Sequence, residues 1–497
     1  MPIERETPVS ANEAQMTDIS FFGHPRGLAT LFFTEMWERF SYYGMRALLI
    51  LFMTATAANG GLGLDVARAG IIYGLYTSSV YLVSLPGGWI ADRLLGARRS
   101  VLYGGILIAI GQFCLVPPGK AIFYAGLLII VLGTGLLKPN VSTIVGLIYP
   151  PGDNRRDAGF SIFYMGINLG AFISPLICGW VGQKINWHLG FGLAGVGMAL
   201  GVVQYAFGGK YLGDAGLRAT PSRGARRNAA LVLTALAFLA AGAVVAIRAG
   251  HVNVTTQLIG DSFGLGLAVI AIGMFTWMIF GPGWSPIERK RSMAILVLFI
   301  AACVFWSAFE QAGSSLNLFA FRNTRNSVFG FDFPASWFQS LNALFIITFA
   351  PIFAWLWISL GKREPSSPAK FAVGLFFVGL GFAVLIPAAF FAGAGGRVSP
   401  MWLVVTYLCH TFGELCLSPV GLSAMTKLAP VRVVSLMMGL WFLSISVGDY
   451  LGGRAASLYA SLPLPLLFGA VAGFAFAAAV VLFLLLKPTV KLMSGVK

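Results

Sequence analysis

Long apolar stretches separated by short polar segments extend over most of the chain. Because a helix needs about 20 apolar residues to cross roughly 30 Å of hydrocarbon, this pattern predicts an all-α polytopic membrane protein. The apolar stretches predict fourteen spans, at residues 28–57, 69–91, 98–117, 121–149, 158–183, 188–208, 228–248, 258–280, 292–318, 335–360, 370–392, 400–428, 432–458 and 464–486.

Polar breaks divide these spans into groups of six, two and six. The link over 209–227 is polar and basic, and a second break reads GPGWSPIERKR over 281–291. The two spans between the breaks carry almost no internal charge, which favours a lipid-facing hairpin. The predicted parts are a cytoplasmic tail (1–27), a six-helix bundle (28–208), a linker with two additional helices (209–291), a second six-helix bundle (292–486) and a cytoplasmic tail (487–497).

The composition supports this class and excludes several others. Hydrophobic residues make up 57% of the chain and charged residues 10%, whereas a soluble domain carries roughly 25% charged residues. The net charge of +16 follows the positive-inside rule rather than indicating nucleic-acid binding. Of 34 Lys and Arg residues, 23 fall on the side of the predicted termini and 7 on the other, which places both termini in the cytoplasm. Residues 1–27 also lack the pattern of a cleaved signal peptide.

The remaining four cations, Arg39, Arg46, Lys138 and Arg454, fall inside the predicted spans together with a few acids. The stretch T-E-M-W-E-R-F-S-Y-Y-G-M-R over 34–46 holds two of each. At 100° per residue its polar side chains form one stripe about 140° wide, and the stripe extends for roughly 16 Å along the helix. Charged side chains at such depth are costly and usually face a cavity. The stripe consists of Glu35, Glu38, Arg39, Tyr42, Tyr43 and Arg46.

Other spans carry single charges that complement this stripe. Lys138 lies just before a proline in GTGLLKPN, Glu310 lies in FWSAFEQ, and Glu414 lies in GELCLSP. The first bundle thus supplies mostly bases and the second supplies lone acids, which suits a ligand with a negative and a positive end. Carboxylates in a low-dielectric cavity can also exchange protons with arginine partners, so Glu310, Glu35 and Glu38 are the candidate proton carriers.

Simpler interpretations of these charges stay open. The stripe can be a salt-bridge cluster that locks helices together, and Lys138 can be a lysine whose side chain reaches the interface from a span end. The segment GGWIADRLLGARRS over 87–100 is interpreted as a conformational latch formed by Asp92, Arg93 and Arg98, with a plain topology determinant as the alternative.

Several motifs together resemble one transporter family. GGWIADRLLGARR resembles the loop signature GxxADRxGRR of the major facilitator superfamily. E-M-W-E-R-F-S-Y-Y-G matches ExxERFxYYG of the proton-dependent oligopeptide transporter family, and FYMGINLGAFISP (163–175) resembles its FYxxINxG signature. KPN, FWSAFEQ, FQSLNALFIITFAP (338–351) and GELCLSP agree as well, so the resemblance extends from about residue 20 to 460. The fourteen-span form looks like a bacterial member.

The resemblance implies a major facilitator fold and proton-driven import of di- and tripeptides across the inner membrane. The expected partners are peptides, protons and membrane lipids, and the protein is expected to be a monomer. It implies a proton-coupling network of Glu35, Glu38, Arg39 and Lys138, with Glu310 as the protonation site that engages Arg39. It places the peptide carboxylate at Arg46 and Lys138, the peptide amine at Glu414, the peptide backbone at Asn168 and Asn342, and side-chain pockets at Tyr42, Tyr43, Tyr81, Trp306 and Trp441.

Alternatives to a peptide symporter differ in what they require. A proton-coupled carrier of an anion or a drug shares the motifs, but an anion carrier has little use for Glu414. A membrane enzyme or channel is disfavoured, because no nucleophile–base pair, metal-ligand spacing or pore filter is present. No GxxxxGK[ST] motif exists for ATP binding. No cofactor, metal or nucleic acid is expected.

Overall fold

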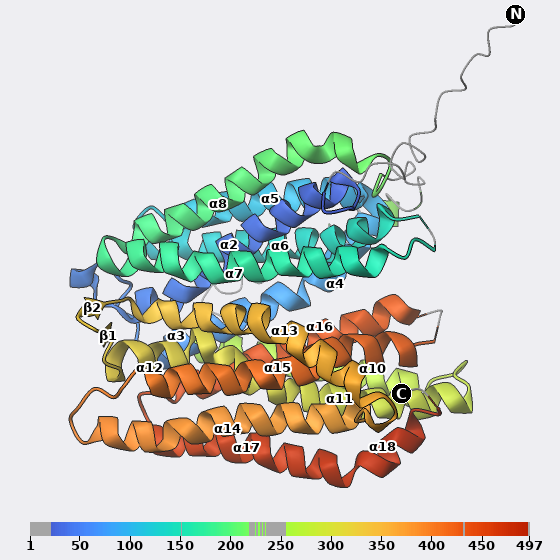
Figure 1. Cartoon of the computed structure of the whole chain (residues 1–497). Coiled ribbons are helices and arrows are strands. Elements are labelled where there is room, and N and C mark those ends of the chain that lie inside the picture. The colour runs from blue at the N-terminus through green and yellow to red at the C-terminus, as the bar shows by residue number, and fades with distance from the viewer. Residues whose placement is uncertain are drawn as a thin grey trace, which may run out of the picture. The chain divides into compact units, whose positions relative to one another are not determined.

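The protein is built almost entirely of helices (Figure 1). This computed structural model describes residues 21–150, 152–217, 255–430 and 433–495, with single positions at 224, 227, 228, 231 and 234. The α-helices are α2 (Arg26–Thr54), α3 (Val66–Leu82), α4 (Ser84–Ile90), α5 (Ala97–Cys114), α6 (Lys120–Leu147), α7 (Arg156–Lys184), α8 (Trp187–Gly208), α10 (Thr256–Phe280), α11 (Pro286–Phe309), α12 (Ser315–Asn323), α13 (Ser340–Leu360), α14 (Ser367–Gly393), α15 (Met401–Leu428), α16 (Val434–Ser457), α17 (Leu464–Leu484) and α18 (Leu486–Leu492).

Short turns and one hairpin complete the elements. They are the 3₁₀ turns η1 (Ala57–Asn59), η3 (Gly209–Leu212), η4 (Glu310–Gly313), η5 (Ala335–Gln339) and η6 (Gly361–Arg363), the π-helical turn η2 (Ala91–Leu95), and the strands β1 (Ser327–Val328) and β2 (Phe331–Asp332). The strands pair antiparallel, with Val328 opposite Phe331. The described segments that are long and apolar enough to cross a membrane are helices. A helix satisfies the hydrogen bonds of its own backbone, as a membrane span must.

The observed helices match the predicted spans closely. Among the described residues, ten helices are long and apolar enough to cross a membrane. Three further predicted spans correspond to α2, to α3 with α4, and to α5. The fourteenth predicted span, 228–248, lies outside the described residues. The protein is therefore a multi-pass membrane protein.

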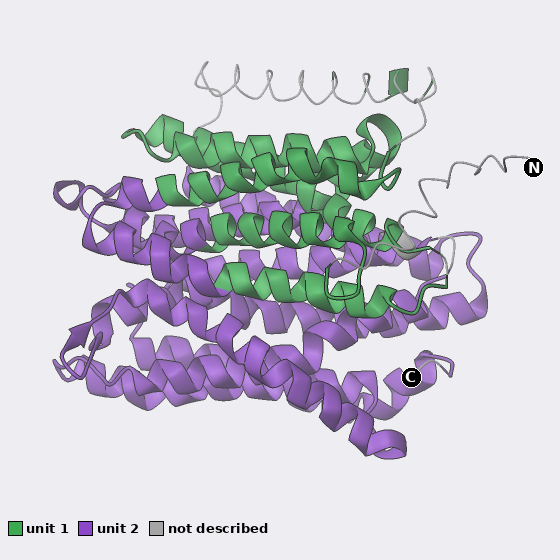
Figure 2. Cartoon of the chain, turned by 45° about the horizontal axis from the view of Figure 1, so that its top comes forward, with its two compact units in different colours: residues 1–43, 83–171, 192–251 green, residues 44–82, 172–191, 252–497 purple. Residues whose placement is uncertain are grey.

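The chain forms two compact units (Figure 2). Unit 1 comprises residues 1–43, 83–171 and 192–251, and unit 2 comprises residues 44–82, 172–191 and 252–497. Within unit 1, α5 packs along α6; within unit 2, α14 packs along α17 and α3 packs along α16. The division into two six-helix bundles with two inserted helices stays a prediction.

One predicted span, 69–91, is not a single helix. It consists of α3, ending at Leu82, and α4, beginning at Ser84, and it continues into η2. Pro86 lies in the first turn of α4. A proline ring clashes with the carbonyl of the residue four positions earlier and donates no hydrogen bond. That residue is Leu82, so the break falls where the proline requires it.

The predicted break over 281–291 is also shorter than expected. Helix α11 already begins at Pro286, six residues before the predicted span. The side chain of Ser285 accepts a hydrogen bond from the backbone N–H of Glu288, and the Glu288 carboxylate accepts one from the N–H of Ser285. This capping box, with proline at the first helical position, is a strong start signal. The basic residues 289–291 therefore belong to α11 and extend it on the N-terminal side of its apolar segment.

The inserted helix α10 is tied to unit 2 by an ion pair. Asp261 Oδ1 lies 3.0 Å from Arg454 Nη2 of α16, and α10 also contacts α3 and α11. The sequence interpretation treated this span as nearly free of charge and gave Arg454 no partner, so Asp261 corrects it. The many exposed apolar residues of α10, such as Leu265 and Ile272, agree with a lipid-facing helix.

One close helix contact in unit 2 depends on glycine. A Cβ atom on Gly453 of α16 would lie 2.4 Å from the Cα of Gly74 and 2.8 Å from the carbonyl oxygen of Gly70, both in α3. No larger side chain fits between two backbones at this distance. Small residues at helix contacts allow this approach in membranes, and it fixes α3 against α16.

We expect Gly453→Val to destabilise the protein by at least ~1–3 kcal/mol, the range for overpacked sites, because backbone atoms must move apart. Thermal unfolding in detergent measures this effect. Gly473→Val in α17 is the matched control, since a Cβ there meets nothing within 4 Å. Equal unfolding temperatures for the two variants would contradict the packing argument.

Candidate functional site

The first charged cluster lies within unit 1 on α2. Arg39 Nε lies 3.3 Å from Glu35 Oε1, and the same nitrogen donates a hydrogen bond to Glu38 Oε2. All three side chains are buried. The predicted i,i+4 pair between Glu35 and Arg39 is therefore present, and Glu38 shares the guanidinium. Two carboxylates against one arginine leave this cluster with an excess of negative charge when both are ionised.

Other residues of unit 1 surround this cluster. The rings of Tyr42 and Tyr43 lie 5.1 Å and 6.0 Å from the Arg39 guanidinium carbon, within cation–π range. Lys138 of α6 interacts electrostatically with Glu35 and offsets the excess acid. Buried Glu35 Oε2 and Arg39 Nη2 have no hydrogen-bond partner among the described residues. An unpaired buried polar atom is costly, so Glu35 Oε2 is suited to accept a proton or a hydrogen bond, and Arg39 Nη2 is suited to donate to an anionic ligand.

The second cluster lies within unit 2 and centres on Arg46. Its Nη2 lies 2.7 Å from Glu310 Oε2, and its Nε donates a hydrogen bond of 2.7 Å to the hydroxyl of Tyr73. All three side chains are buried. Arg46 has no acid partner on its own helix, and the structure supplies one from far along the sequence. The engagement of Glu310 with Arg39, implied by family resemblance, stays a prediction.

Local backbone structure explains how Glu310 reaches this position. Helix α11 ends at Phe309, and Glu310 begins the 3₁₀ turn η4. A Cβ atom on Gly313 of this turn would lie 1.9 Å from the Tyr73 hydroxyl and 2.8 Å from Arg46 Nε. Glycine at this position therefore leaves the space that the hydrogen-bonded pair occupies. A 3₁₀ stretch within a long helical run often marks a functional hinge or a strained sequence, and η4 joins α11 to α12.

Glu414 of α15 belongs to a separate polar group in unit 2. Asn342 Nδ2 of α13 donates hydrogen bonds to Glu414 Oε2 at 2.9 Å and to Thr411 Oγ1 at 3.1 Å. Glu414 also interacts electrostatically with Glu310 and Arg46. Asn342 and Glu414, both predicted to bind a peptide, therefore lie together, and the charge of Glu414 is linked to the Arg46 cluster.

The remaining predicted binding residues occupy both units. In unit 2, the rings of Trp306 and Trp441 lie 6.4 Å apart and nearly perpendicular, and Tyr81 stacks on Phe442 at 6.3 Å. In unit 1, the amide of Asn168 donates to the carbonyl of Tyr164 on its own helix. Because the indole Nε1 of Trp306 has no hydrogen-bond partner among the described residues, it is a candidate donor to a ligand.

The predicted latch residues lie in unit 1. Arg98, in the first turn of α5, donates a hydrogen bond of 2.7 Å to the carbonyl of Gly213 and a second one to the carbonyl of Gly209. Arg98 thus holds the turn that follows α8. Asp92 and Arg93 are exposed in η2. The basic segment therefore makes a helix-end contact through Arg98, and its role as a latch stays a prediction.

Sequence reasoning missed two partners of the predicted site residues. Tyr73 was not singled out, although it holds Arg46, and Thr411 was missed beside Glu414. A tyrosine in an apolar span needs a partner for its hydroxyl, so Tyr73 carried a weak signal. Thr411 lies three residues before Glu414, on the same helix face, which was a second available signal.

These buried, paired charges define the class of the protein. Ionisable groups inside membrane-spanning helices are rare, and they mark the paths of ions and substrates in pumps and transporters. The combination of many apolar helices with such clusters on α2, η4 and α15 is that of a secondary transporter.

Comparison with known proteins identifies the family. The model of the POT family matches residues 98–470. The chain is 42% identical to the peptide transporter YePEPT of Yersinia enterocolitica, with 96% of each chain covered. It is 40% identical to a di-/tripeptide transporter of Lactococcus lactis, covering 97% of this chain and 99% of the relative. A crystal structure of a peptide transporter POT in complex with sulfate shares 45% identity at a TM-score of 0.92, over 97% of this chain and 99% of the other.

The chain therefore belongs to the POT family, and its fold is that of the major facilitator transporters. Members of this family are transporters rather than enzymes. The resemblance drawn from the motifs is confirmed.

We expect Tyr73→Phe to destabilise the protein by roughly 1.5–3 kcal/mol, because it removes a hydrogen bond to a buried cation. Thermal unfolding in detergent is the measurement. Tyr103→Phe is the matched control, since the Tyr103 side chain is 43% exposed. If both substitutions leave the unfolding temperature unchanged, Tyr73 does not hold Arg46 in the folded protein.

Proposed function

We propose that this protein is a proton-coupled symporter that imports di- and tripeptides by alternating access. It acts as a monomer in the cytoplasmic membrane of a bacterium, with both termini in the cytoplasm. Its relatives support the substrate class, since two of them are a peptide transporter and a di-/tripeptide transporter. The distribution of Lys and Arg supports the orientation.

The observation that carries this proposal is the buried contact of 2.7 Å between Arg46 and Glu310. A guanidinium binds carboxylates well, so the C-terminal carboxylate of a peptide competes with Glu310 for Arg46. Protonation of Glu310 removes its charge and releases Arg46 for the peptide. Proton and peptide then bind together, because each weakens the same ion pair in the empty protein.

The opposite end of the peptide requires an acid. Glu414 is held by Asn342 at 2.9 Å and lies within the electrostatic reach of Arg46. An ionised Glu414 attracts the N-terminal ammonium of a peptide, while Asn342 offers its amide to the peptide backbone. An anion without an ammonium group gains nothing from this carboxylate. The pair therefore favours a zwitterionic substrate over a simple anion.

The cluster on α2 supplies a second place for protons. Glu35 and Glu38 share Arg39, and Lys138 lies near Glu35. A proton on one carboxylate leaves the other paired with Arg39, so the cluster changes its charge without losing its ion pair. We propose that Glu35 and Glu38 pass protons to and from Glu310, and that Asp92, Arg93 and Arg98 stabilise one of the alternating conformations.

Purified protein in liposomes should accumulate a labelled dipeptide when an inward proton gradient is imposed. One proton that crosses ~100 mV and one pH unit releases about 3.7 kcal/mol, which supports several-hundredfold accumulation of a neutral solute. Uptake of the labelled dipeptide against time is the measurement, and liposomes without a gradient are the control. Equal uptake with and without the gradient contradicts proton coupling.

Glu310→Gln should abolish gradient-driven accumulation and preserve peptide exchange by counterflow, because glutamine keeps the shape of the side chain but cannot carry the proton. Asp65→Asn is the control, since Asp65 forms an exposed ion pair with Arg68 and should leave both assays unchanged. Driven uptake by Glu310→Gln at the unsubstituted rate would show that Glu310 is not the essential proton site.

A further inference from the structure

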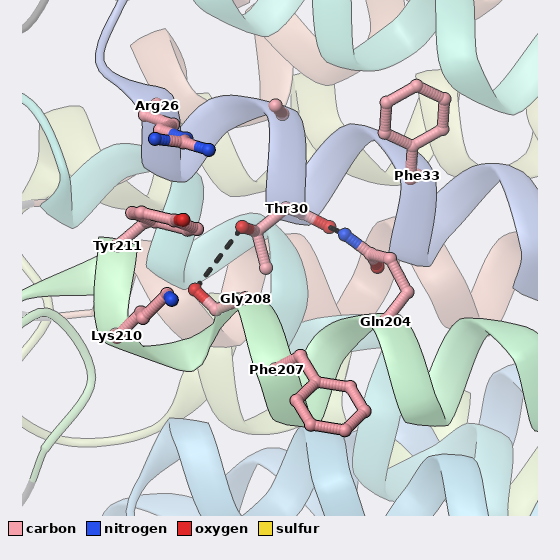
Figure 3. Close-up of a pocket in the computed structure, with 9 residues that line it drawn as sticks. Arg26, Thr30, Phe33, Gln204, Phe207, Gly208, Lys210 and Tyr211 are labelled. Carbon is pink, nitrogen blue, oxygen red and sulfur yellow. Dashed lines mark hydrogen bonds between the residues drawn. The ribbon is translucent and has the colours of Figure 1, made fainter.

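A cavity of about 300 Å³ lies within unit 1, where the start of α2 meets the end of α8 (Figure 3). It is separate from the buried clusters of charged residues. Its lining residues come from two short stretches: Arg26, Ala29, Thr30, Phe33, Gln204, Phe207, Gly208, Lys210 and Tyr211.

The mouth of the cavity is basic. The guanidinium carbon of Arg26 lies 4.0 Å from the centroid of the Tyr211 ring, and Lys210 Nζ lies 5.1 Å from the same centroid. Figure 3 shows the two cations on either side of this ring. The lining residues include no Asp or Glu, so the wall itself carries two positive charges. Both cations are exposed, and a ligand can reach them.

The floor of the cavity has little polar capacity left. Thr30 Oγ1 donates to the carbonyl of Gly208 at 3.3 Å, and Gln204 Nε2 donates to the carbonyl of Thr30 at 3.3 Å. Thr34 Oγ1 additionally donates to Gln204 Oε1 at 3.0 Å. A water-soluble polar solute would find these groups already paired to one another. The floor therefore does not favour a second site for such a solute.

The walls beyond the cations are apolar and open. Phe207 is 78% exposed and Phe33 is 39% exposed, and Figure 3 shows both rings farther along the helices than Arg26 and Lys210. Phe33 lies seven residues into α2, which is about 10 Å deeper along the helix axis than Arg26. An amphipathic anion matches this order, with its charge at the mouth and its hydrocarbon along the phenylalanines.

We propose that this cavity binds the headgroup of an anionic phospholipid, with Arg26 and Lys210 at the phosphate and the acyl chains along Phe33 and Phe207. Basic pockets between membrane helices bind such headgroups. A zwitterionic lipid gains less, because Arg26 and Lys210 repel its ammonium group. The same two cations already lie over the ring of Tyr211, which could otherwise bind that group. A free phosphate satisfies the cations but leaves both phenylalanines without a contact.

The proposal is tested on the full-length protein in neutral detergent. Native mass spectrometry measures the apparent Kd for phosphatidylglycerol and for phosphatidylcholine. The protein should bind phosphatidylglycerol more tightly. Arg26→Gln and Lys210→Gln should each weaken that binding about five-fold, and the double variant roughly 25-fold, since each basic residue near a membrane surface contributes about this factor.

Arg156→Gln is the matched control. Arg156 is an exposed cation at the start of α7, at 6.0 Å from the ring of Phe160, and it does not line the cavity. Its substitution should leave both Kd values unchanged. Unfolding temperatures measured in phosphatidylcholine should agree among all variants, which establishes that the cation variants remain folded.

A third measurement separates a lipid from a free anion. Inorganic phosphate at millimolar concentration should not displace phosphatidylglycerol, and Phe207→Ser should weaken the binding of the lipid. Displacement by phosphate, equal affinity for the two lipids, or unchanged binding by the double variant would each overturn the proposal.

Discussion

The cost of a charged side chain inside a membrane constrains this protein more than any other factor. A charge at the bilayer centre costs at least ~2.5–3.5 kcal/mol, and α2 alone carries four buried ionisable groups. Each of them has an oppositely charged partner: Arg39 lies against Glu35 and Glu38, and Arg46 lies against Glu310. Breaking a buried pair leaves an uncompensated charge. Any ligand that displaces one partner must therefore supply the missing charge.

This constraint connects the architecture to transport. In the proposed transport cycle, a proton neutralises Glu310 and a peptide carboxylate takes its place at Arg46, and neither step has a low cost without the other. The neighbouring groups reinforce the requirement, since Tyr73 fixes the guanidinium and Asn342 fixes Glu414. The close contact between Gly74 and Gly453 packs α3, which carries Tyr73, directly against α16.

The helices were predicted well because the length of each apolar stretch can be read directly from the sequence. Thirteen of the predicted spans correspond to described helices, and the polar stripe of α2 forms the expected pair between Glu35 and Arg39. The prediction failed where local stereochemistry sets the ends of a helix, or where a charged residue pairs with a residue distant in the sequence. The clash caused by Pro86 divides a span, and the capping box at Ser285 starts α11 early. The partners of Arg46 and Arg454 come from residues far along the chain, and no helical periodicity reveals such contacts.

The cations at the start of α2 and in η3 illustrate the opposite solution to the same constraint. Arg26 and Lys210 are exposed beside the aromatic ring of Tyr211, and the cavity wall around them supplies no acid. Inside a span such cations would need carboxylates, as Arg39 and Arg46 do. At the membrane surface an anionic lipid supplies the counter-charge from the bilayer itself, and the exposed Phe207 remains in contact with hydrocarbon. Helix α2 therefore has internal carboxylates where lipid phosphates cannot reach its arginines, and Arg26 stays exposed where they can.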